Sequence, residues 1–250
     1  MRNRIKKLNK QTFQSIVDSK LHNTEYVATH QERFIYITNA VNKYFLKYNV
    51  NIKILDFGSH TGVLAVILQD YGYNVTSIDL ESSIEDNIQT YTQNKLKVDS
   101  LTQQWDQLPY EDNYFDSVIF SEVLEHIYES PVQILKELYR ILKPNGVLIL
   151  TTPNVMKLEN KIKFFLHINI YQDIERFCYS PRYYLHFREY TEKDIEILLE
   201  KYLNFRDLTF YYFDYVGGRT IIRRFIQRMI YIISIILIKF RGSILVIAKK

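Results

Sequence analysis

Residues 55–62 read LDFGSHTG, and this stretch decides the expected fold. The apolar run before it, 52–57, is typical of a buried strand, and 62–71 is typical of a helix. Gly58 allows a tight turn and the close approach of a ligand to the backbone. Gly62 stands where the helix begins, and the free N–H groups of that first turn favour an anionic group.

Asp79 extends this pattern to a second strand. It follows the apolar strand expected at 74–78 and lies 17 residues after Gly62. A carboxylate at the tip of that strand can accept two hydrogen bonds from a ribose diol. The turn and the acid together predict a nucleotide-type ligand, and both a dinucleotide and an adenosyl compound fit the pattern.

Strands and helices continue to alternate along the chain, which predicts a parallel sheet covered by helices on both faces. The fold class is therefore α/β and doubly wound, with ligands expected beyond the carboxyl ends of the strands. Ser130 is expected to cap one helix, with Pro131 at its first position, and Thr191 to cap another. Further strands are expected at 95–99, 115–120, 147–150, 204–212 and 243–248, and further helices at 31–48, 130–142 and 191–202.

Composition restricts the class of protein. The chain has 250 residues, of which 47% are hydrophobic and 24% charged, so it is neither disordered nor collagen-like. Cys178 is the single cysteine, which excludes an intramolecular disulfide and favours a reducing compartment. No apolar segment of the signal-peptide type follows the basic first ten residues. These features predict a cytoplasmic protein.

The net charge of +4 is unevenly distributed. Residues 1–20 carry +5 and residues 219–250 carry +8, which leaves −9 for the middle of the chain. Basic ends favour contact with phosphate or with anionic lipid. An ordinary solvated surface explains the same pattern.

Several segments in sequence order resemble the class I S-adenosylmethionine-dependent methyltransferases. The resemblance covers about residues 50–210 and implies a Rossmann-like sheet of seven strands, with 243–248 as the antiparallel last strand. It also implies S-adenosyl-L-methionine as the cofactor. The matching segments are 55–62, Asp79, 108–110, 115–119, 121–127, 138–146, 151–154 and 186–191.

The resemblance implies a role for each residue of the cofactor site. The glycine turn would line the methionine end, Asp79 would hold the ribose, and residues 104–105 would flank the base. His60 stands where the family usually has a glycine, and Gln104 stands where it often has an acid. The implied cofactor-binding residues are Asp56, Gly58, Ser59, His60, Gly62, Asp79, Leu80, Gln104, Trp105 and Ser121.

Glu122, Glu125 and His126 are spaced to share one face of a helical turn. With His186 as a fourth ligand they could bind a divalent cation. The run resembles the Glu-x-x-Glu-His segment of small-RNA 2′-O-methyltransferases and some quinone O-methyltransferases, in which it supports a metal. Without a metal, His126 or Glu122 would be the general base for a hydroxyl acceptor. Both interpretations stay open.

The expected methyltransferase domain covers residues 49–250. Residues 1–48 before it are expected to form a loosely ordered arm with some helix, followed by a helix, and two segments inside the domain have a separate character. Residues 154–190 are rich in aromatic side chains and are expected to form a lid over the acceptor pocket. Residues 219–241 are expected to form a helix, basic and amphipathic at first and then apolar. It would lie in a membrane interface or pack on the domain or on a partner subunit.

The expected function is methyl transfer to oxygen. The acceptor classes that the resemblance and the apolar basic helix favour are a glycan, a lipid-linked sugar or a prenylated aromatic compound. An RNA 2′-O-methyltransferase with a metal-assisted site is the alternative within the enzymes. A cofactor-binding regulatory module without turnover is the alternative outside them. The oligomeric state does not follow from the sequence.

Overall fold

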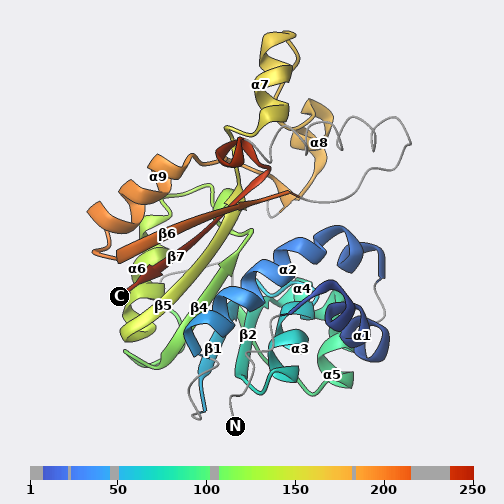
Figure 1. Ribbon diagram of the computed structural model, residues 1–250, viewed down its shortest axis with the longest axis vertical. Helices are drawn as coiled ribbons and strands as arrows, with labels where there is room; N and C mark the ends of the chain where they lie inside the picture. Colours follow the sequence, from blue (N-terminus) through green and yellow to red (C-terminus); the bar gives the residue numbers. More distant parts are fainter. Residues whose placement is uncertain (1–7, 22–23, 46–50, 102–106, 182–183, 215–236) are drawn as a thin grey trace.

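The computed structural model describes residues 8–21, 24–45, 51–101, 107–181, 184–214 and 237–250. Its centre is one seven-stranded sheet with the strand order β3-β2-β1-β4-β5-β7-β6 (Figure 1). The first five strands pair in parallel, and β7 runs antiparallel to β5 and β6. The Rossmann-like methyltransferase fold predicted from the sequence is confirmed. The strands are β1 (Lys53–Phe57), β2 (Asn74–Leu80), β3 (Lys97–Leu101), β4 (Phe115–Ser121), β5 (Leu142–Pro153), β6 (Arg206–Phe213) and β7 (Ser243–Lys249).

Neighbouring residues of the central strands face two different cores. Ile54 and Ile119 lie in one core, whereas Leu55 and Val118 lie in the other. This alternation follows from the two-residue repeat of a strand, and both faces are apolar because helices cover both. The sheet is therefore buried on both faces, and the carboxyl ends of its parallel strands lie together at one end of it.

Helices from the N-terminal half cover one face of the sheet. These are α1 (Lys10–Lys20), α2 (Thr24–Phe45) and α3 (Val63–Asp70), which share one core with the strands. The other face is covered by α6 (Val132–Ile141) and α9 (Glu192–Glu196), which continues as a π-helical turn. Two short helices, α4 (Glu81–Asp86) and α5 (Ile88–Gln93), connect β2 to β3. The sequence analysis did not predict α4 and α5.

The N-terminal segment is more ordered than the sequence analysis predicted. Asn9 caps α1 by accepting the N–H of Thr12, and Phe13 and Val17 are buried. The helix expected within the arm is α1, whose many polar residues occupy the exposed face. α2 begins at Thr24 instead of residue 31, since Val27 extends its buried stripe by two turns. The division of the chain at residue 48 thus separates segments that share one hydrophobic core.

Helix ends confirm one predicted cap and correct another. Thr191 and Asp194 form a reciprocal capping box at the start of α9. At α6 the cap position belongs to Pro131 and not to Ser130, and no side chain caps this helix. Three of the expected strands also shift. β3 lies two residues later than predicted, β5 begins at Leu142, five residues earlier, and β6 begins at Arg206, two residues later.

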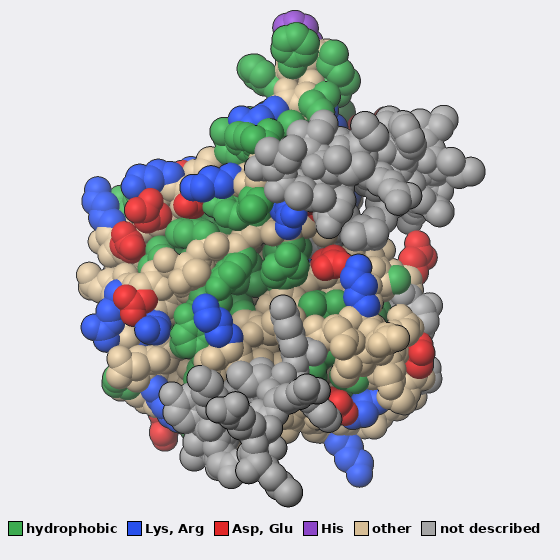
Figure 2. Space-filling model, viewed as in Figure 1, with side chains coloured by type: hydrophobic (Ala, Val, Ile, Leu, Met, Phe, Trp, Pro, Cys, Tyr) green, Lys and Arg blue, Asp and Glu red, His purple; other side chains and the backbone are tan. Residues whose placement is uncertain are grey.

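Two helices project from the sheet between β5 and α9. They are α7 (Leu158–Phe165) and α8 (Ile174–Tyr179), with α7 at the top of Figure 1. Hydrophobic side chains gather on this projection in Figure 2. Of the expected helix over 219–241, residues 219–236 lie outside the described part of the chain, and a short 3₁₀ turn (Ile238–Phe240) leads into β7. No helix in the described ranges is long and apolar enough to cross a membrane.

Candidate cofactor and acceptor site

A cavity of about 1870 Å³ lies beyond the carboxyl ends of β1, β2 and β4. Its walls come from the β1–α3 turn, the end of β2, the segment after β4, α2 and the base of α7. Pockets for single small molecules are about 300–1,000 Å³. The cavity therefore has room for a cofactor and a second ligand side by side.

The turn after β1 lines one end of this cavity. Gly58, His60 and Gly62 all have positive φ angles, +73°, +45° and +70°. A Cβ at Gly58 would lie 2.4 Å from Cγ2 of Val123, so only glycine fits there. Gly58 N–H donates to the carbonyl of Ile78 at 2.9 Å, which fixes the turn against the end of β2.

Asp79 lies beside this turn, as the sequence predicted. Its Oδ2 accepts the backbone N–H of His60 at 2.5 Å, and its Oδ1 accepts that of Leu80 at 2.7 Å. A carboxylate has about four acceptor sites, so these bonds leave capacity for ribose hydroxyls. Leu80 and Ser59 line the same cavity. Gln104 and Trp105 lie outside the described residues.

Asp56 is a buried acid that fits a cationic ligand. It is 2% exposed, lines the cavity, and its Oδ2 has no hydrogen-bond partner among the described residues. Burial, together with the nearby Asp79, raises its pKa to about 7. An unsatisfied carboxyl group beside the glycine turn suits the amino group and sulfonium of S-adenosylmethionine. The residues present therefore fit this cofactor.

Asp56→Asn is expected to flatten the dependence of stability on pH. Because the folded-state pKa lies above the ordinary 3.8, Asp56 contributes stability that is complete below pH 3.8 and lost as pH rises through 7. The asparagine variant lacks this loss, so it should gain up to about 4 kcal/mol relative to wild type between pH 3 and pH 8. Urea unfolding at several pH values measures this, and an equal offset at every pH would contradict the raised pKa.

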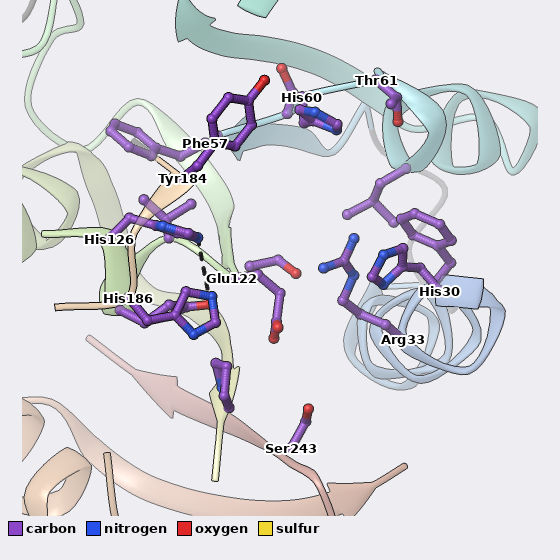
Figure 3. Close-up of a pocket in the computed structure, with 18 of the residues that line it drawn as sticks. His30, Arg33, Phe57, His60, Thr61, Glu122, His126, Tyr184, His186 and Ser243 are labelled. Carbon is purple, nitrogen blue, oxygen red and sulfur yellow. Dashed lines mark ion pairs between the residues drawn. The ribbon is translucent and has the colours of Figure 1, made fainter. Parts of the chain in front are cut away.

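Glu125, His126 and His186 form a cluster at the other end of the cavity. Each offers one ligand atom, and these atoms lie within 4.8 Å of one another. Figure 3 shows His126 and His186 side by side. Glu125 is 1% exposed; its Oε2 accepts the hydroxyl of Thr152 at 3.0 Å, whereas its Oε1 has no hydrogen-bond partner among the described residues. Burial and the neighbouring Glu122 raise the pKa of Glu125 well above its ordinary value.

The tautomer of His126 follows from its hydrogen bond. Nδ1 lies 3.0 Å from the carbonyl oxygen of Leu185, which can only accept, so Nδ1 carries the proton. Nε2 then has a free lone pair and lies 4.0 Å from Oε1 of Glu125. Burial and then the nearby His186 lower the pKa of His126 to about 4. A neutral imidazole with its lone pair beside a buried carboxyl group has the form of a metal ligand.

Glu122 does not join this cluster, contrary to the expected shared face. It has a φ of +56°, and its Oε1 accepts the hydroxyl of Thr151 at 2.9 Å. The short 3₁₀ turn η1 (Leu124–His126) follows in place of a regular helix, so the three-residue spacing does not align the two glutamates. Ser121 lies next to Glu122 in the cavity wall, with its Oγ 2.8 Å from Oγ1 of Thr151.

Helix α2 supplies functional candidates that sequence reasoning missed. His30 and Arg33 project from α2 into the cavity, opposite Glu122 (Figure 3). Arg33 is 7% exposed, and its Nη2 donates to the hydroxyl of Tyr26 at 2.8 Å. In the sequence, only the spacing of His30 and Arg33, three residues apart beside the apolar stripe of the helix, pointed to them. That signal is weak, because such residues usually face solvent.

The aromatic residues of the expected lid mostly point away from the cavity. Phe164, Phe165, Tyr171 and Tyr179 are 76–87% exposed. Tyr184 lines the cavity, so at this position the expected contact is present. Tyr183 lies outside the described residues. The prediction that the lid aromatics cover the acceptor is therefore wrong for α7 and α8, because the helices extend from the sheet instead of folding over its edge.

Known proteins are similar in sequence to part of this chain. A family model described as a methyltransferase domain matches residues 55–150. A ubiquinone biosynthesis O-methyltransferase of Rickettsia typhi is 35% identical over 139 residues, which are 53% of this chain and 54% of that protein. A second such enzyme, from Rickettsia conorii, is 37% identical over 107 residues, 42% of this chain and 36% of that protein. The chain thus spans about half the length, or less, of these relatives.

Solved structures share the fold across nearly the whole chain. A SAM-dependent methyltransferase from Archaeoglobus fulgidus superposes with a TM-score of 0.57 at 18% identity, covering 91% of this chain and 100% of that one. A phosphoethanolamine N-methyltransferase of Haemonchus contortus in complex with S-adenosyl-L-methionine gives 0.56 at 15% identity, covering 95% and 60%. The fold, the glycine turn and the strand-end acid are similar to those expected of a class I, S-adenosylmethionine-dependent methyltransferase domain. Residues 55–150 therefore match a methyltransferase domain, and the chain around them shares the fold of these methyltransferases.

Proposed function

We propose that this chain is an S-adenosylmethionine-dependent methyltransferase acting on an oxygen atom of its acceptor. One observation carries the proposal: a single cavity joins the glycine turn and Asp79 to the cluster of Glu125, His126 and His186. The first end suits the cofactor and the second suits a hydroxyl acceptor. The similarity to ubiquinone biosynthesis O-methyltransferases supports oxygen as the methylated atom.

Each residue at the cofactor end has a defined task. The turn 58–62 brings backbone groups close to the methionine portion, and Asp56 provides the negative charge opposite its amino group. Asp79 accepts the ribose hydroxyls, and Leu80 offers an apolar contact to the base. The cofactor supplies the methyl group, held on a positively charged sulfur. The protein orients the ligand.

At the acceptor end we propose a divalent cation held by Glu125, His126 and His186. The cation would lower the pKa of an acceptor hydroxyl. Two observations support this assignment: Oε1 of Glu125 has no hydrogen bond among the described residues, and Nε2 of His126, 4.0 Å away, keeps its lone pair. With a pKa of about 4, His126 would hold a proton poorly near neutral pH, which argues against His126 as the general base. Glu122 is close enough to the cluster to raise the pKa of Glu125, but it belongs to the cavity wall and not to the cation site.

The proposed acceptor is lipid-borne, such as a prenylated aromatic compound or a lipid-linked sugar. The base of α7, from Lys157 to Glu159, lines the cavity, while Phe164 and Phe165 at its end are 76% and 82% exposed. An apolar projection beside the mouth of a cavity suits contact with the surface from which such an acceptor comes. The basic and apolar sequence of 219–241 supports membrane contact from composition alone.

Replacing both Phe164 and Phe165 with serine is expected to weaken binding to vesicles containing anionic lipid. Burying a phenylalanine side chain contributes about 1.5 kcal/mol or more, so losing two should lower partitioning by about a hundredfold. Sedimentation with phosphatidylglycerol vesicles measures this. Ile88→Ser is the matched control, because Ile88 is 51% exposed on α5. Equal sedimentation of all three proteins would contradict membrane contact through α7.

Calorimetry with S-adenosylmethionine and transfer of a labelled methyl group test the proposal as a whole. Binding is expected in the micromolar range, with transfer to a hydroxylated, apolar aromatic acceptor. Transfer to RNA instead would move the acceptor class to ribose 2′-hydroxyls. Cofactor binding without transfer to any class would indicate a regulatory module, and absence of binding would refute the cofactor site.

A further inference from the structure

His60 stands in the cofactor turn at a position where a side chain is unexpected. Its φ of +45° lies in the left-handed region, which favours glycine and strains most other residues. Its backbone nevertheless has two defined bonds. The N–H donates to Asp79, and the carbonyl accepts the hydroxyl of Tyr91 at 3.0 Å. Backbone hydrogen bonds therefore hold the turn in place, and the imidazole of His60 takes no part in them.

The imidazole packs against α2. Its ring centroid lies 5.2 Å from that of Tyr26, and the ring of Tyr26 in turn lies 4.4 Å from that of His30. Aromatic pairs at such distances attract each other beyond simple burial. His60 thus connects the cofactor turn to the first turns of α2 through side chains alone, across 34 positions of sequence.

Tyr26 carries this connection to Arg33. The tyrosine hydroxyl accepts a hydrogen bond from Nη2 of Arg33 at 2.8 Å, seven residues further along α2. Arg33 is buried, and Figure 3 shows its guanidinium directed into the cavity. Tyr26 therefore contacts His60 with its ring and Arg33 with its hydroxyl. The position of the guanidinium depends on where Tyr26 is held.

Of the side chains in this stack, Arg33 carries the positive charge. Burial, with smaller contributions from Arg33 and His60, lowers the pKa of His30 to about 3, so His30 is neutral at ordinary pH. The guanidinium lies close enough to Asp56 and Glu125 to oppose the rise in their pKa values. It is thus placed where an anionic group of a bound ligand, such as the carboxylate of an amino-acid portion, would find a positive partner.

We propose that His60 is a positioning residue for the cofactor: its ring fastens α2 to the cofactor turn through Tyr26 and thereby holds Arg33 toward the ligand. The inference rests on the proposed function for the identity of that ligand. A glycine at this position would keep the turn and lose the fastening. The left-handed strain of His60 is therefore retained for a contact that a glycine does not make.

The variant His60→Gly separates this role from a merely structural one. Glycine relieves the left-handed strain, so the melting temperature should stay the same or rise. The dissociation constant of S-adenosylmethionine, measured by calorimetry, should nevertheless increase about fivefold, because the aromatic contact is lost. His167→Gly is the matched control, since His167 is an exposed histidine with a φ of +55° far along the chain in the α7–α8 segment. It should leave the dissociation constant unchanged.

A double-mutant cycle tests whether the effect passes through Arg33. Arg33→Met should weaken binding about tenfold by itself. If His60 acts by holding Arg33, adding His60→Gly to Arg33→Met should change the dissociation constant less than twofold. A full fivefold further loss in the double variant would overturn the proposed route, and unchanged affinity of His60→Gly alone would overturn the role of the ring.

Hydrogen exchange tests the fastening without any ligand. Backbone amides of α2 between Val27 and Arg33 should exchange faster in His60→Gly than in wild type, and at the wild-type rate in His167→Gly. Equal exchange in all three proteins would overturn the proposal. If wild type fails to bind S-adenosylmethionine, the proposed function falls, and the exchange measurement still decides whether His60 fastens α2.

Discussion

Glu125→Gln is expected to reduce methyl transfer at least about a hundredfold, and a chelator is expected to abolish transfer by the wild-type protein. Glutamine has nearly the shape of glutamic acid but no charge to offer a cation. Residues that act as one unit lose most of their effect when any one of them is removed. His126→Ala and His186→Ala should therefore be about as inactive as Glu125→Gln.

The fold should tolerate the glutamine. Glu125 is 1% exposed, and burial already favours its uncharged form. The amide can still accept the hydroxyl of Thr152, so the melting temperature should not fall. Glu200→Gln, at an exposed carboxylate outside the cavity wall, is the control for the substitution itself.

Adding divalent cations distinguishes metal-assisted transfer from general-base catalysis by His126. After chelation, addition of Mg²⁺, Mn²⁺ or Zn²⁺ one at a time should restore transfer with at least one of them. If transfer is unaffected by chelator and by Glu125→Gln, but is lost in His126→Ala, then His126 is the general base and the cluster holds no cation. The measurement is initial rate with labelled cofactor at saturating acceptor.

Asp79→Ala is expected to raise the dissociation constant of S-adenosylmethionine about a hundredfold or more. Hydrogen bonds to a charged acceptor contribute roughly 1.5–3 kcal/mol each, so two ribose bonds amount to about 3 kcal/mol at the least. The alanine also removes the acceptor for the N–H of His60, which loosens the turn itself. Both losses act in the same direction.

Asp79→Asn separates the loss of the ribose hydrogen bonds from the loosening of the turn. The amide oxygen can still accept the N–H of His60, so the turn should persist while the charge is gone. Its dissociation constant should lie between those of wild type and Asp79→Ala. Glu81→Ala, an exposed acid two residues further on, should bind as wild type does. Calorimetry with parallel thermal melting measures all four proteins, and unchanged affinity of folded Asp79→Ala would remove Asp79 from the site.

The cofactor end of the cavity was readable because it is built from short-range sequence. A strand, a turn that needs glycine at Gly58 and Gly62, and an acid at the end of the next strand are each encoded within a few residues. Parallel strands bring their carboxyl ends to one edge whatever the rest of the chain does. Asp56 and Asp79 therefore line the cavity near the turn, as expected.

Only part of the acceptor end of the cavity could be predicted from the sequence. Glu125 and His126 were correctly grouped with His186, although 60 residues separate His126 from His186. The resemblance supplied that grouping, since no local pattern links such distant positions. Glu122 was misplaced because a helical spacing was assumed, whereas a left-handed residue and a 3₁₀ turn follow β4. Backbone conformation at the end of a strand depends on the loops packed against it.

By itself the sequence determined the order of the strands and of α2, α3, α6 and α9, the two glycines that the turn requires and the acids at the strand ends, because periodicity and backbone sterics are local properties. Only the tertiary structure decided that α2 contributes Tyr26, His30 and Arg33 to the cavity. It also decided that α7 projects away from the cavity. A helix reveals its apolar face in its own sequence, but the rotation that places the residues beside that face over a site depends on packing against a core assembled from the whole chain.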